Sequence, residues 1–488
     1  MECDLQMMRV ERTNTGIIIH EATYNVKEKC LQYFSLQDPV REYFLYSGSD
    51  PNNKPRFGNE HDVIYITSGF GEIDDPVVDT VKHGRRIHPN TPRHIELKMT
   101  RSPRSQLQTD CIRLLTESKS PKITVELKPG VGKTFIAMYS ASKLGLKPLI
   151  VVPTTMLKNQ WIENIEECGI PTDEIATNIF DQDKKCCVVT ITSLENAVRD
   201  NWTGLLDAVN NGQYGIKIID EAHLHLKGIL KFDALCNVKH NWYLSATLGR
   251  SDSAEDTILN RALADAERFV GNKKYEEYQK EYIRIYQQDI YYQPSQKLCN
   301  DCFKYGKKGL IKSSYYQMLM QYKKGIPFMT NMINMVKKIR ALTKSDKKVL
   351  LLIPLLDIIR KVLNIMQHDP YFKHLNVVMV DGSMPQAQKR DNLENGDIIL
   401  STVSSMGTGV DVQNLIAVIN FDQLASPISL EQIVGRLRDR GYDTIYVDIC
   451  DHVKYAKAIS NWGRKRRSMF PYFPGVYSEM YCFPPIYS

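Results

Sequence analysis

Short apolar runs alternate with helix-forming stretches along most of this chain of 488 residues. A first set of runs reads KITVEL, PLIVVP, CCVVTIT, YGIKIIDEAH and NWYLSAT, and a second reads KKVLLLIP, NVVMVDG, DIILST, LIAVINF and DTIYVDI. β-Branched runs of this length, separated by helical segments, are typical of parallel strands joined by crossover helices. The sequence therefore predicts an α/β protein with two parallel-sheet domains.

The length and the changes in pattern predict five segments. Residues 1–98 are expected to form a small α+β accessory domain that binds DNA, and residues 99–265 the first parallel-sheet domain. Residues 266–335, rich in Tyr, Lys and Gln, read as a linker or inserted helical element. Residues 336–452 form the second parallel-sheet domain, and residues 453–488 a basic and aromatic tail.

Composition excludes several classes of protein. Hydrophobic residues make up 43% of the chain and charged residues 24%, as in soluble globular proteins. No apolar run approaches the length of a membrane span, and no secretion signal is readable. The 11 cysteines are scattered, which favours reduced thiols and a cytoplasmic location. The net charge of +7 permits a polyanionic partner without requiring one.

The stretch VELKPGVGKTF, residues 125–135, follows one apolar run and precedes a helical stretch. Gly130 and Gly132 allow backbone N–H groups to face a phosphate, Lys133 can reach the β and γ phosphates, and Thr134 can ligate Mg²⁺. Leu127 stands where the usual phosphate-loop pattern begins with glycine. The alternative interpretation is an ordinary glycine-rich turn between strand and helix.

A pair of carboxylates supports the nucleotide interpretation. Asp220 and Glu221 follow the apolar run at residues 216–219, at the end of a strand where α/β sheets bind ligands. An Asp–Glu pair elsewhere is usually a solvated helix start. Here Asp220 is suited to hold Mg²⁺, and Glu221 to orient or deprotonate the attacking water.

In this order the motifs resemble those of superfamily 2 helicases of the DEAD/DEAH-like type. QTDCI resembles the adenine-reading glutamine motif, LKPGVGKT motif I, VVPTTMLKNQW motif Ia, TITSLEN motif Ib and DEAH motif II. YLSATLGR resembles motif III, VMVDGSM with Arg390 motif IV, NGDIILSTVSSMGTGVDV motif V and EQIVGRLRDR motif VI. The family accepts a residue other than glycine at the position of Leu127.

The resemblance implies two tandem RecA-like lobes of a P-loop NTPase that bind ATP between them, with ATP and Mg²⁺ as cofactors. It implies catalytic roles for Lys133, Asp220, Glu221, Gln432, Arg436 and Arg438. It implies nucleotide contacts for Gln108, Pro129, Gly130, Val131, Gly132, Lys133, Thr134, Gly409 and Asp411, and Mg²⁺ ligation for Thr134 and Asp220. Ser245 and Thr247 of motif III are expected to link the ATP state to lobe position.

Motif VI departs from the family pattern at one position. The family places a second arginine three residues after the first, where this chain has Asp439. Arg438 and Arg440 flank that position, and either can supply the second arginine. The alternative for both is a solvated basic helix face.

Nucleic-acid contacts are expected from motifs Ia, Ib and V and from the cluster GRKRR in the tail. The candidates are Pro153, Thr154, Thr192, Ser193, Thr402, Arg464, Lys465, Arg466 and Arg467. Ordinary strand-end turns are the alternative for the motif residues, and a solvated tail for the cluster. Cys299 and Cys302 form a lone CxxC pair that lacks the second pair of a zinc site.

Within the superfamily, the chain resembles phage UvsW-like and RecG-like branch-migration helicases. That resemblance implies a motor on forked, branched or single-stranded DNA, with recombination or replication proteins as further partners and no membrane. Three alternatives stay open. They are an RNA helicase, the motor subunit of a restriction-type complex, and a regulatory nucleic-acid-binding protein with an inactive ATP site.

Overall fold

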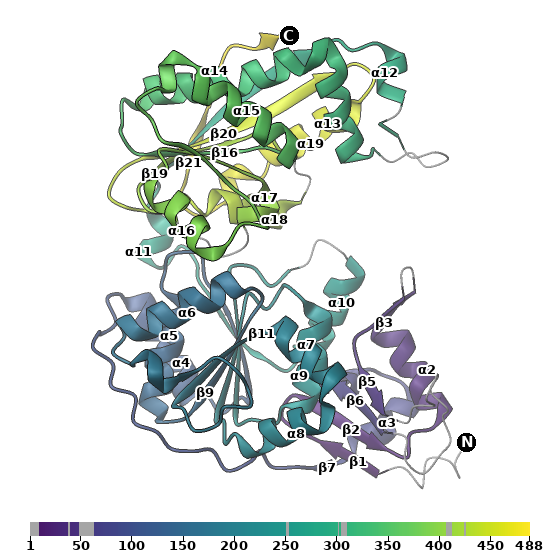
Figure 1. The fold of residues 1–488 in the computed structure, drawn as a ribbon. Coiled ribbons are helices and arrows are strands. Elements are labelled where there is room, and N and C mark those ends of the chain that lie inside the picture. Colours follow the sequence, from purple (N-terminus) through teal and green to yellow (C-terminus); the bar gives the residue numbers. More distant parts are fainter. Residues whose placement is uncertain are drawn as a thin grey trace. The chain divides into compact units, whose positions relative to one another are not determined.

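The computed structural model describes residues 9–37, 40–47, 63–249, 253–300, 302–303, 310–406, 412–423 and 426–488. The chain divides into two compact units, Met1–Asn272 and Lys273–Ser488 (Figure 1). Each unit is built around a sheet in which every pairing is parallel, as the alternating pattern predicts. Among the described residues, no helix is both long and apolar enough to span a membrane.

The first unit begins with a small α+β part. Its elements are β1 (Arg9–Arg12), β2 (Gly16–His20), α2 (Tyr24–Tyr33), β3 (Ser35–Gln37), β4 (Val40–Glu42), β5 (Leu45–Ser47), β6 (Val63–Thr67), η1 (Ser68–Glu72), α3 (Pro76–Lys82) and β7 (Arg85–Arg86). The sheet order is β5-β6-β2-β1-β7, and β3 pairs with β4 as a separate hairpin. The expected α+β character of this part is therefore present.

The parallel sheet of the first unit has the order β10-β11-β9-β12-β13-β8-β14. Its strands are β8 (Lys122–Glu126), β9 (Pro148–Val152), β10 (Ile175–Ala176), β11 (Cys186–Thr190), β12 (Ile216–Asp220), β13 (His240–Ser245) and β14 (Glu267–Val270). Its helices are α4 (Gln106–Glu117), α5 (Lys133–Leu144), α6 (Thr155–Glu167), η2 (Thr172–Glu174), α7 (Ile191–Asp200), α8 (Trp202–Asn211), α9 (Leu226–Leu235) and α10 (Ser253–Ala262). Helices α4–α6 cover one face and α7–α9 the other (Figure 1).

The N-terminal part is joined to the parallel-sheet part by buried contacts. Gly16 of β2 lies so close to α9 that a Cβ atom there would be 2.7 Å from the Cα of Ala234. Lys217 of β12 forms a buried 2.6 Å ion pair with Asp233 of α9, and its Nζ also donates to the Thr15 hydroxyl of the N-terminal part over 3.5 Å. The hydroxyl of Thr15 donates to the Asp233 carbonyl over 2.8 Å. The two parts therefore share one hydrophobic core instead of forming independently packed domains.

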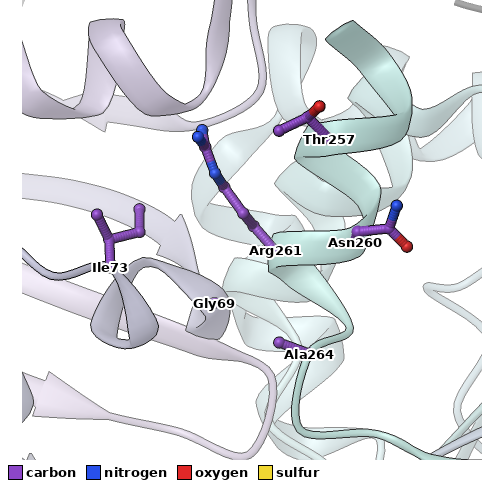
Figure 2. Close-up of a pocket in the computed structure, with 6 residues that line it drawn as sticks. All are labelled: Gly69, Ile73, Thr257, Asn260, Arg261 and Ala264. Atoms are coloured by element: carbon purple, nitrogen blue, oxygen red, sulfur yellow. The ribbon is translucent and has the colours of Figure 1, made fainter. Parts of the chain in front are cut away.

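A pocket lies at the same junction, between η1 and α10 (Figure 2). It is lined by Gly69, Ile73, Thr257, Asn260, Arg261 and Ala264. The Arg261 guanidinium extends from α10 toward the N-terminal part and donates to the Tyr33 carbonyl over 2.8 Å. Arg261 is thus a further link between the two parts.

The second unit has the sheet order β17-β18-β16-β19-β20-β15-β21, with β22 also paired to β15. Its strands are β15 (Ile283–Tyr292), β16 (Lys348–Leu352), β17 (Val377–Val380), β18 (Ile398–Ser401), β19 (Leu415–Asn420), β20 (Thr444–Val453), β21 (Val476–Cys482) and β22 (Ile486–Tyr487). Its helices are α11 (Glu276–Gln279), α12 (Gln296–Asn300), α13 (Lys312–Gln321), η3 (Tyr322–Gly325), α14 (Ile326–Thr343), α15 (Leu356–His368), η4 (Pro370–Phe372), α16 (Gln386–Asn395), α17 (Val403–Met406), α18 (Pro427–Val434), α19 (Lys457–Arg467) and η5 (Phe470–Tyr472).

The expected segment boundaries differ from the structure in two places. Residues 266–335 are not a linker, because β14 pairs with β8 in the first sheet and β15 pairs with β20 over its whole length in the second. Residues 453–488 are not a free tail, because β21 and β22 both pair with β15. The polar composition of IRIYQQDIYY concealed a strand whose glutamines are buried, with Gln288 Nε2 bonded to the Pro484 carbonyl over 2.8 Å.

Candidate nucleotide site and nucleic-acid contacts

The sequence motifs of the first unit gather at one edge of its sheet. Strands β11, β9, β12, β13 and β8 are neighbours in that order, and their carboxyl ends carry motifs Ib, Ia, II, III and I. All five strands are parallel, so these ends lie at the same edge. The fold thus brings together residues that are separated by more than a hundred positions in the chain.

The phosphate-loop candidate has the predicted strand–loop–helix context, from β8 to α5. Gly130 and Gly132 have φ angles of 88° and 94°, in the left-handed region where glycine is favoured. Gly132 is the N-cap of α5, and a Cβ atom there would lie 2.9 Å from Gln108 Nε2. Glycine is required by both conformation and space, which leaves the α5 N-terminus accessible to an anion.

Leu127 now has a structural explanation. Its side chain is fully buried, and its backbone N–H donates to the Ser245 carbonyl over 2.9 Å. Its own carbonyl accepts from Lys133 Nζ over 3.2 Å. Leu127 therefore anchors the start of the loop to β13 and holds the Lys133 ammonium over the loop, while the glycines supply the curvature.

Gln108 of α4 is buried against the same loop. Its Nε2 donates to the Val131 carbonyl over 2.8 Å, and its Oε1 accepts from the Arg104 backbone N–H over 3.0 Å. The Arg104 guanidinium donates to the Gly130 carbonyl over 3.0 Å. Both residues brace the phosphate loop, and the adenine-reading role that the resemblance implies for Gln108 stays a prediction.

Asp220 and Glu221 lie at the end of β12 and are both buried. Burial, followed by the charge of Glu221, raises the pKa of Asp220, whereas the Lys133 charge and a hydrogen bond from Trp161 oppose that rise. Trp161 Nε1 of α6 donates to Asp220 Oδ2 over 2.7 Å. Trp161 is a site residue that sequence reasoning missed, although it occurs within the motif Ia stretch.

The carboxylates fit a divalent cation. Among the described residues Glu221 Oε2 accepts no hydrogen bond, and His223 Nδ1 lies 3.4 Å from it. A buried carboxylate oxygen without a donor is costly unless a metal ion or water satisfies it. Asp220 and Thr134 would hold Mg²⁺, which supplies positive charge to the phosphates of bound ATP.

His223 connects motif II to motif III. Its Nδ1 lies 2.8 Å from Ser245 Oγ at the end of β13. Ser245 Oγ also accepts from the Thr247 backbone N–H over 3.1 Å and contacts the Thr247 carbonyl. Glu221, His223, Ser245 and Thr247 thus form a continuous chain of polar contacts, so a change at the carboxylates can reach the loop after β13.

Comparison with known families agrees with this geometry. Residues 93–248 match the model described as type III restriction enzyme, res subunit, and residues 331–440 match the helicase conserved C-terminal domain. The first match covers the loop and both carboxylates, and the second covers motif VI and the strands β16, β17, β18 and β19 of the second sheet. The chain is a superfamily 2 helicase.

Known relatives of this helicase are named as helicases or transcript termination proteins. A putative DNA 3'-5' helicase Rad25 of Haloarcula marismortui is 30% identical over 131 residues, 27% of this chain and 21% of that protein. A putative ATP-dependent RNA helicase of Acanthamoeba polyphaga mimivirus is 25% identical over 422 residues, 82% of this chain and 73% of that protein. A transcript termination protein of vaccinia virus (strain Ankara) is 29% identical over 119 residues, 23% of each chain. The helicase thus spans 21% and 28% of the first two curated relatives.

Solved structures support the fold alone. S. cerevisiae Dbp5 bound to RNA and ADP BeF3 superposes with a TM-score of 0.51 at 14% identity, covering 78% of this chain and 90% of that chain. The expectation of two RecA-like lobes with a small N-terminal part is confirmed. The resemblance to the UvsW-like and RecG-like branch has no support among these relatives and stays a prediction.

The predicted nucleic-acid residues of motifs Ia and Ib occupy neighbouring helix starts. Thr154 caps α6 by accepting from the Leu157 N–H over 3.2 Å, and Pro153 beside it is buried. Thr192 and Ser193 are exposed on the first turn of α7. Thr402 of the second unit differs, because it is buried and its hydroxyl accepts from the Ser405 N–H over 2.9 Å. Thr402 therefore shapes its own loop, whereas Thr192 and Ser193 are exposed to a ligand.

Motif VI extends from α18 into the loop that follows. Gln432 lies on α18, Arg436 is buried just after it, and Arg438 is half-buried. Asp439 forms a 2.6 Å ion pair with Lys280. Arg440 donates to Gln413. The position of the family's second arginine is therefore held by an acidic residue with a partner of its own.

Two predicted nucleotide contacts, Gly409 and Asp411, lie outside the described residues. The CxxC cysteines are both buried, and Cys302 Sγ donates to the Ser314 carbonyl over 3.7 Å.

The exposed side chains in the basic cluster of α19 are Arg464 and Lys465. The expectation of a nucleic-acid contact is wrong for Arg466, which is buried and paired with Asp448 at 2.8 Å. Arg467 forms a 2.8 Å ion pair with Asp289 and is partly exposed, so its predicted nucleic-acid contact stays a prediction.

Proposed function

We propose that this helicase hydrolyses ATP to move along nucleic acid and that DNA is its substrate. The observation that carries the proposal is the convergence of the phosphate loop and the buried Asp220–Glu221 pair at one sheet edge. Lys133 supplies positive charge to ATP phosphates, and the α5 N-terminus supplies backbone N–H donors. These features are those of a phosphate site, and they also argue against an inactive ATP site.

The residues divide the chemistry of hydrolysis among them. Water attacks the γ-phosphorus, the bond to the β–γ bridging oxygen breaks, and ADP leaves with inorganic phosphate. Glu221 Oε2 is suited to orient that water and accept its proton, because it accepts no hydrogen bond among the described residues. The contact from His223 to Ser245 connects the carboxylates, where hydrolysis takes place, to the loop that follows β13. We infer that this connection couples hydrolysis to movement.

DNA is favoured as the substrate by the names of two archaeal relatives, both putative DNA 3'-5' helicases. RNA is the second candidate, because the relative that overlaps 82% of this chain is named a putative RNA helicase. A preference for forked or branched DNA, with roles in recombination and repair, stays a prediction from the sequence resemblance. The nucleic-acid contacts proposed in motifs Ia and Ib would grip phosphates and so would not select a base sequence.

One panel of substrates tests the proposal. ATP turnover and strand separation are measured with single-stranded DNA, duplex DNA, a fork, a four-way junction and an RNA duplex, for wild type and for Glu221→Gln. We expect DNA to stimulate wild-type turnover at least about tenfold and the variant to stay at background. Stimulation by RNA alone would replace DNA with RNA as the substrate. No stimulation by any of them would refute a nucleic-acid motor.

A further inference from the structure

Helix α19 is held rigidly against the second sheet by its inner residues. Arg466 is buried, and its guanidinium donates to Asp448 Oδ1 over 2.8 Å, to the Ile449 carbonyl over 2.8 Å and to Gln423 Oε1 over 3.1 Å. Gly463 lies directly over β20, since a Cβ atom there would be 2.1 Å from Cys450 Sγ. The absent side chain allows the helix to approach the strand closely.

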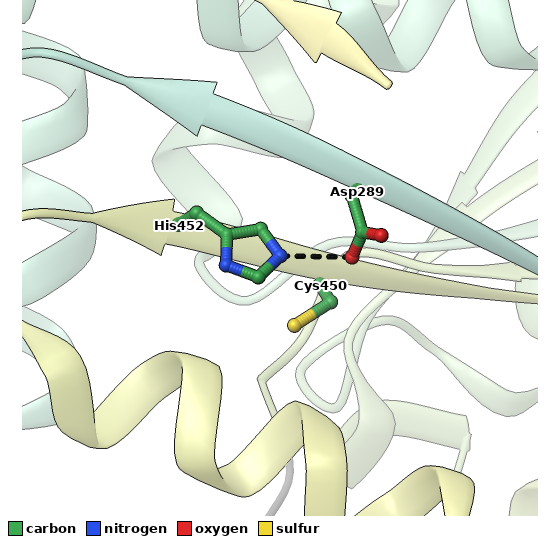
Figure 3. Close-up of side chains that lie close together, drawn as sticks. All are labelled: Asp289, Cys450 and His452. Carbon is green, nitrogen blue, oxygen red and sulfur yellow. Dashed lines mark hydrogen bonds and ion pairs between the residues drawn. The ribbon is translucent and has the colours of Figure 1, made fainter. Parts of the chain in front are cut away.

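A second set of contacts fixes the C-terminal end of the same helix. Asp289 of β15 accepts from His452 Nε2 over 2.8 Å, beside Cys450 on β20 (Figure 3). The same carboxylate accepts from the Arg467 guanidinium over 2.8 Å. Arg467 and Arg466 thus use their charges inside the protein, so they orient α19 and leave its other face outward.

The outward face of α19 is basic and lacks acidic residues. Lys457, Arg464 and Lys465 are exposed on this helix, and Lys454 is exposed just before it. Within the described part of the chain none of these four forms an ion pair, and Arg464 bonds only the neutral amide oxygen of Asn461. No Asp or Glu occurs between Asp451 and Glu479. The positive charge is therefore uncompensated along this segment.

An exposed aromatic ring follows the helix in the chain. Tyr472 of η5, five residues after the end of α19, is 84% exposed, the highest value among the exposed large hydrophobic side chains of the described residues. Lys457 and Arg464 lie seven residues apart on α19, about 10.5 Å along the helix axis. Cations on a fixed helix that is followed within five residues by an exposed aromatic ring suit a nucleic-acid strand, whose phosphates pair with cations and whose bases stack on rings.

We propose that the outer face of α19, together with Tyr472, is an additional nucleic-acid contact of this helicase. The face lies outside the residues that match the two helicase family models, 93–248 and 331–440. This inference rests on the proposed function, because the face adds to the surface through which the motor contacts nucleic acid. The cations hold the phosphate backbone of either a single strand or a duplex, and Tyr472 stacks on an unpaired base.

The test measures binding of fluorescently labelled single-stranded and duplex DNA to the full chain over a series of salt concentrations. Arg464→Ala with Lys465→Ala should weaken the binding of both DNAs about tenfold near physiological salt. For the single strand it should also lower the slope of log affinity against log salt concentration by about 1.4. Tyr472→Ala should weaken the binding of single-stranded DNA about fivefold or more and leave the affinity for duplex DNA unchanged. Lys361→Ala with Lys373→Ala, which removes two exposed cations elsewhere on this unit, should bind as wild type.

The outcomes separate this inference from the proposed function. An unchanged melting temperature shows that the variants are folded. DNA-stimulated ATP turnover in wild type, with wild-type affinity in the Arg464/Lys465 variant, would overturn the inference and leave the motor intact. Loss of binding to vesicles containing phosphatidylserine, with DNA affinity unchanged, would assign the face to a lipid surface and also overturn it. Equal loss in the Lys361/Lys373 control would show a general charge effect and count against it.

Discussion

Trp161 Nε1 donates a 2.7 Å hydrogen bond to Asp220 Oδ2 from the helix that follows the neighbouring strand. The indole is almost fully buried, so it holds the carboxylate in one orientation and excludes water from its far side. Substituting a group that orients a metal-binding side chain typically lowers metal affinity or activity about 10–100-fold. The tryptophan is therefore a positioning residue of the nucleotide site.

Trp161→Phe keeps an aromatic ring in the core but removes the N–H donor. We expect the Mg²⁺ concentration that gives half-maximal ATP turnover to rise roughly tenfold, because the Asp220 carboxylate loses its fixed orientation. A magnesium titration at saturating ATP measures the change. Trp462→Phe, the same substitution in the second unit, is the control. An unchanged magnesium requirement in Trp161→Phe would assign the indole to packing alone.

Lys133→Ala and Glu221→Gln should both abolish turnover but differ in nucleotide binding. Loss of the Lys133 charge removes an attraction to the phosphates, so binding of a fluorescent ATP analogue should weaken at least about tenfold. Glu221→Gln should bind the analogue as wild type while turnover falls by about a hundredfold or more. Lys143→Ala, an exposed lysine of α5, serves as the control. Turnover near the wild-type rate in either variant would refute the assignment.

Alanine substitution identifies the second arginine of motif VI. Arg436→Ala and Arg438→Ala are expected to lower kcat at least about tenfold, because the negative charge on the transferred phosphoryl group is then stabilised by one cation fewer. Arg440→Ala should stay within about twofold, because Arg440 already bonds Gln413. Steady-state ATP turnover with saturating DNA gives the comparison. A larger loss in Arg440→Ala than in Arg438→Ala would exchange their roles.

Arg466→Ala should reduce stability, contrary to the role in nucleic-acid binding that the sequence suggested. Removing the guanidinium leaves the fully buried Asp448 carboxylate without its 2.8 Å partner. Breaking a buried pair on one side typically costs about 3–5 kcal/mol in the free energy of unfolding. Lys465→Ala, on the exposed face, should change it by less than about 0.5 kcal/mol. Urea unfolding followed by tryptophan fluorescence measures both.

Asp451 predicts a dependence of stability on pH. Burial raises its pKa to about 7, although a hydrogen bond from Tyr315 lowers it. In the unfolded chain an aspartate ionises near pH 3.9, so between about pH 4 and pH 7 the folded state holds a proton that the unfolded state releases. This contribution is complete below the unfolded pKa and disappears as pH rises through the folded one.

Asp451→Asn removes that proton linkage while keeping the shape of the side chain. Its stability relative to wild type should therefore increase from pH 4 to pH 7, by up to about 4 kcal/mol, and level off above. Chemical unfolding at a series of pH values checks this. Asp357→Asn, a change at an exposed carboxylate, is the control. A difference between Asp451→Asn and wild type that is constant with pH would contradict the raised pKa.

The sequence by itself determined the parallel sheets and the residues of the phosphate loop. Buried parallel strands are continuous apolar runs, and glycines at positive φ cannot be replaced without strain, so both features are visible without coordinates. β9 is an example, because PLIVV is apolar throughout, lies between two helical segments of the chain and is buried at every position. The sequence alone predicted a structural feature wherever the residues of one continuous segment define that feature.

Tertiary structure alone decided which polar residues face inward. β15 reads as polar, yet it is an inner strand of its sheet because β20 and β21 lie on either side of it. Arg464 and Arg466 are chemically identical and two positions apart, yet one is exposed and the other is buried on Asp448. Helical periodicity places them on different faces, but only the packed sheet determines which face meets a carboxylate.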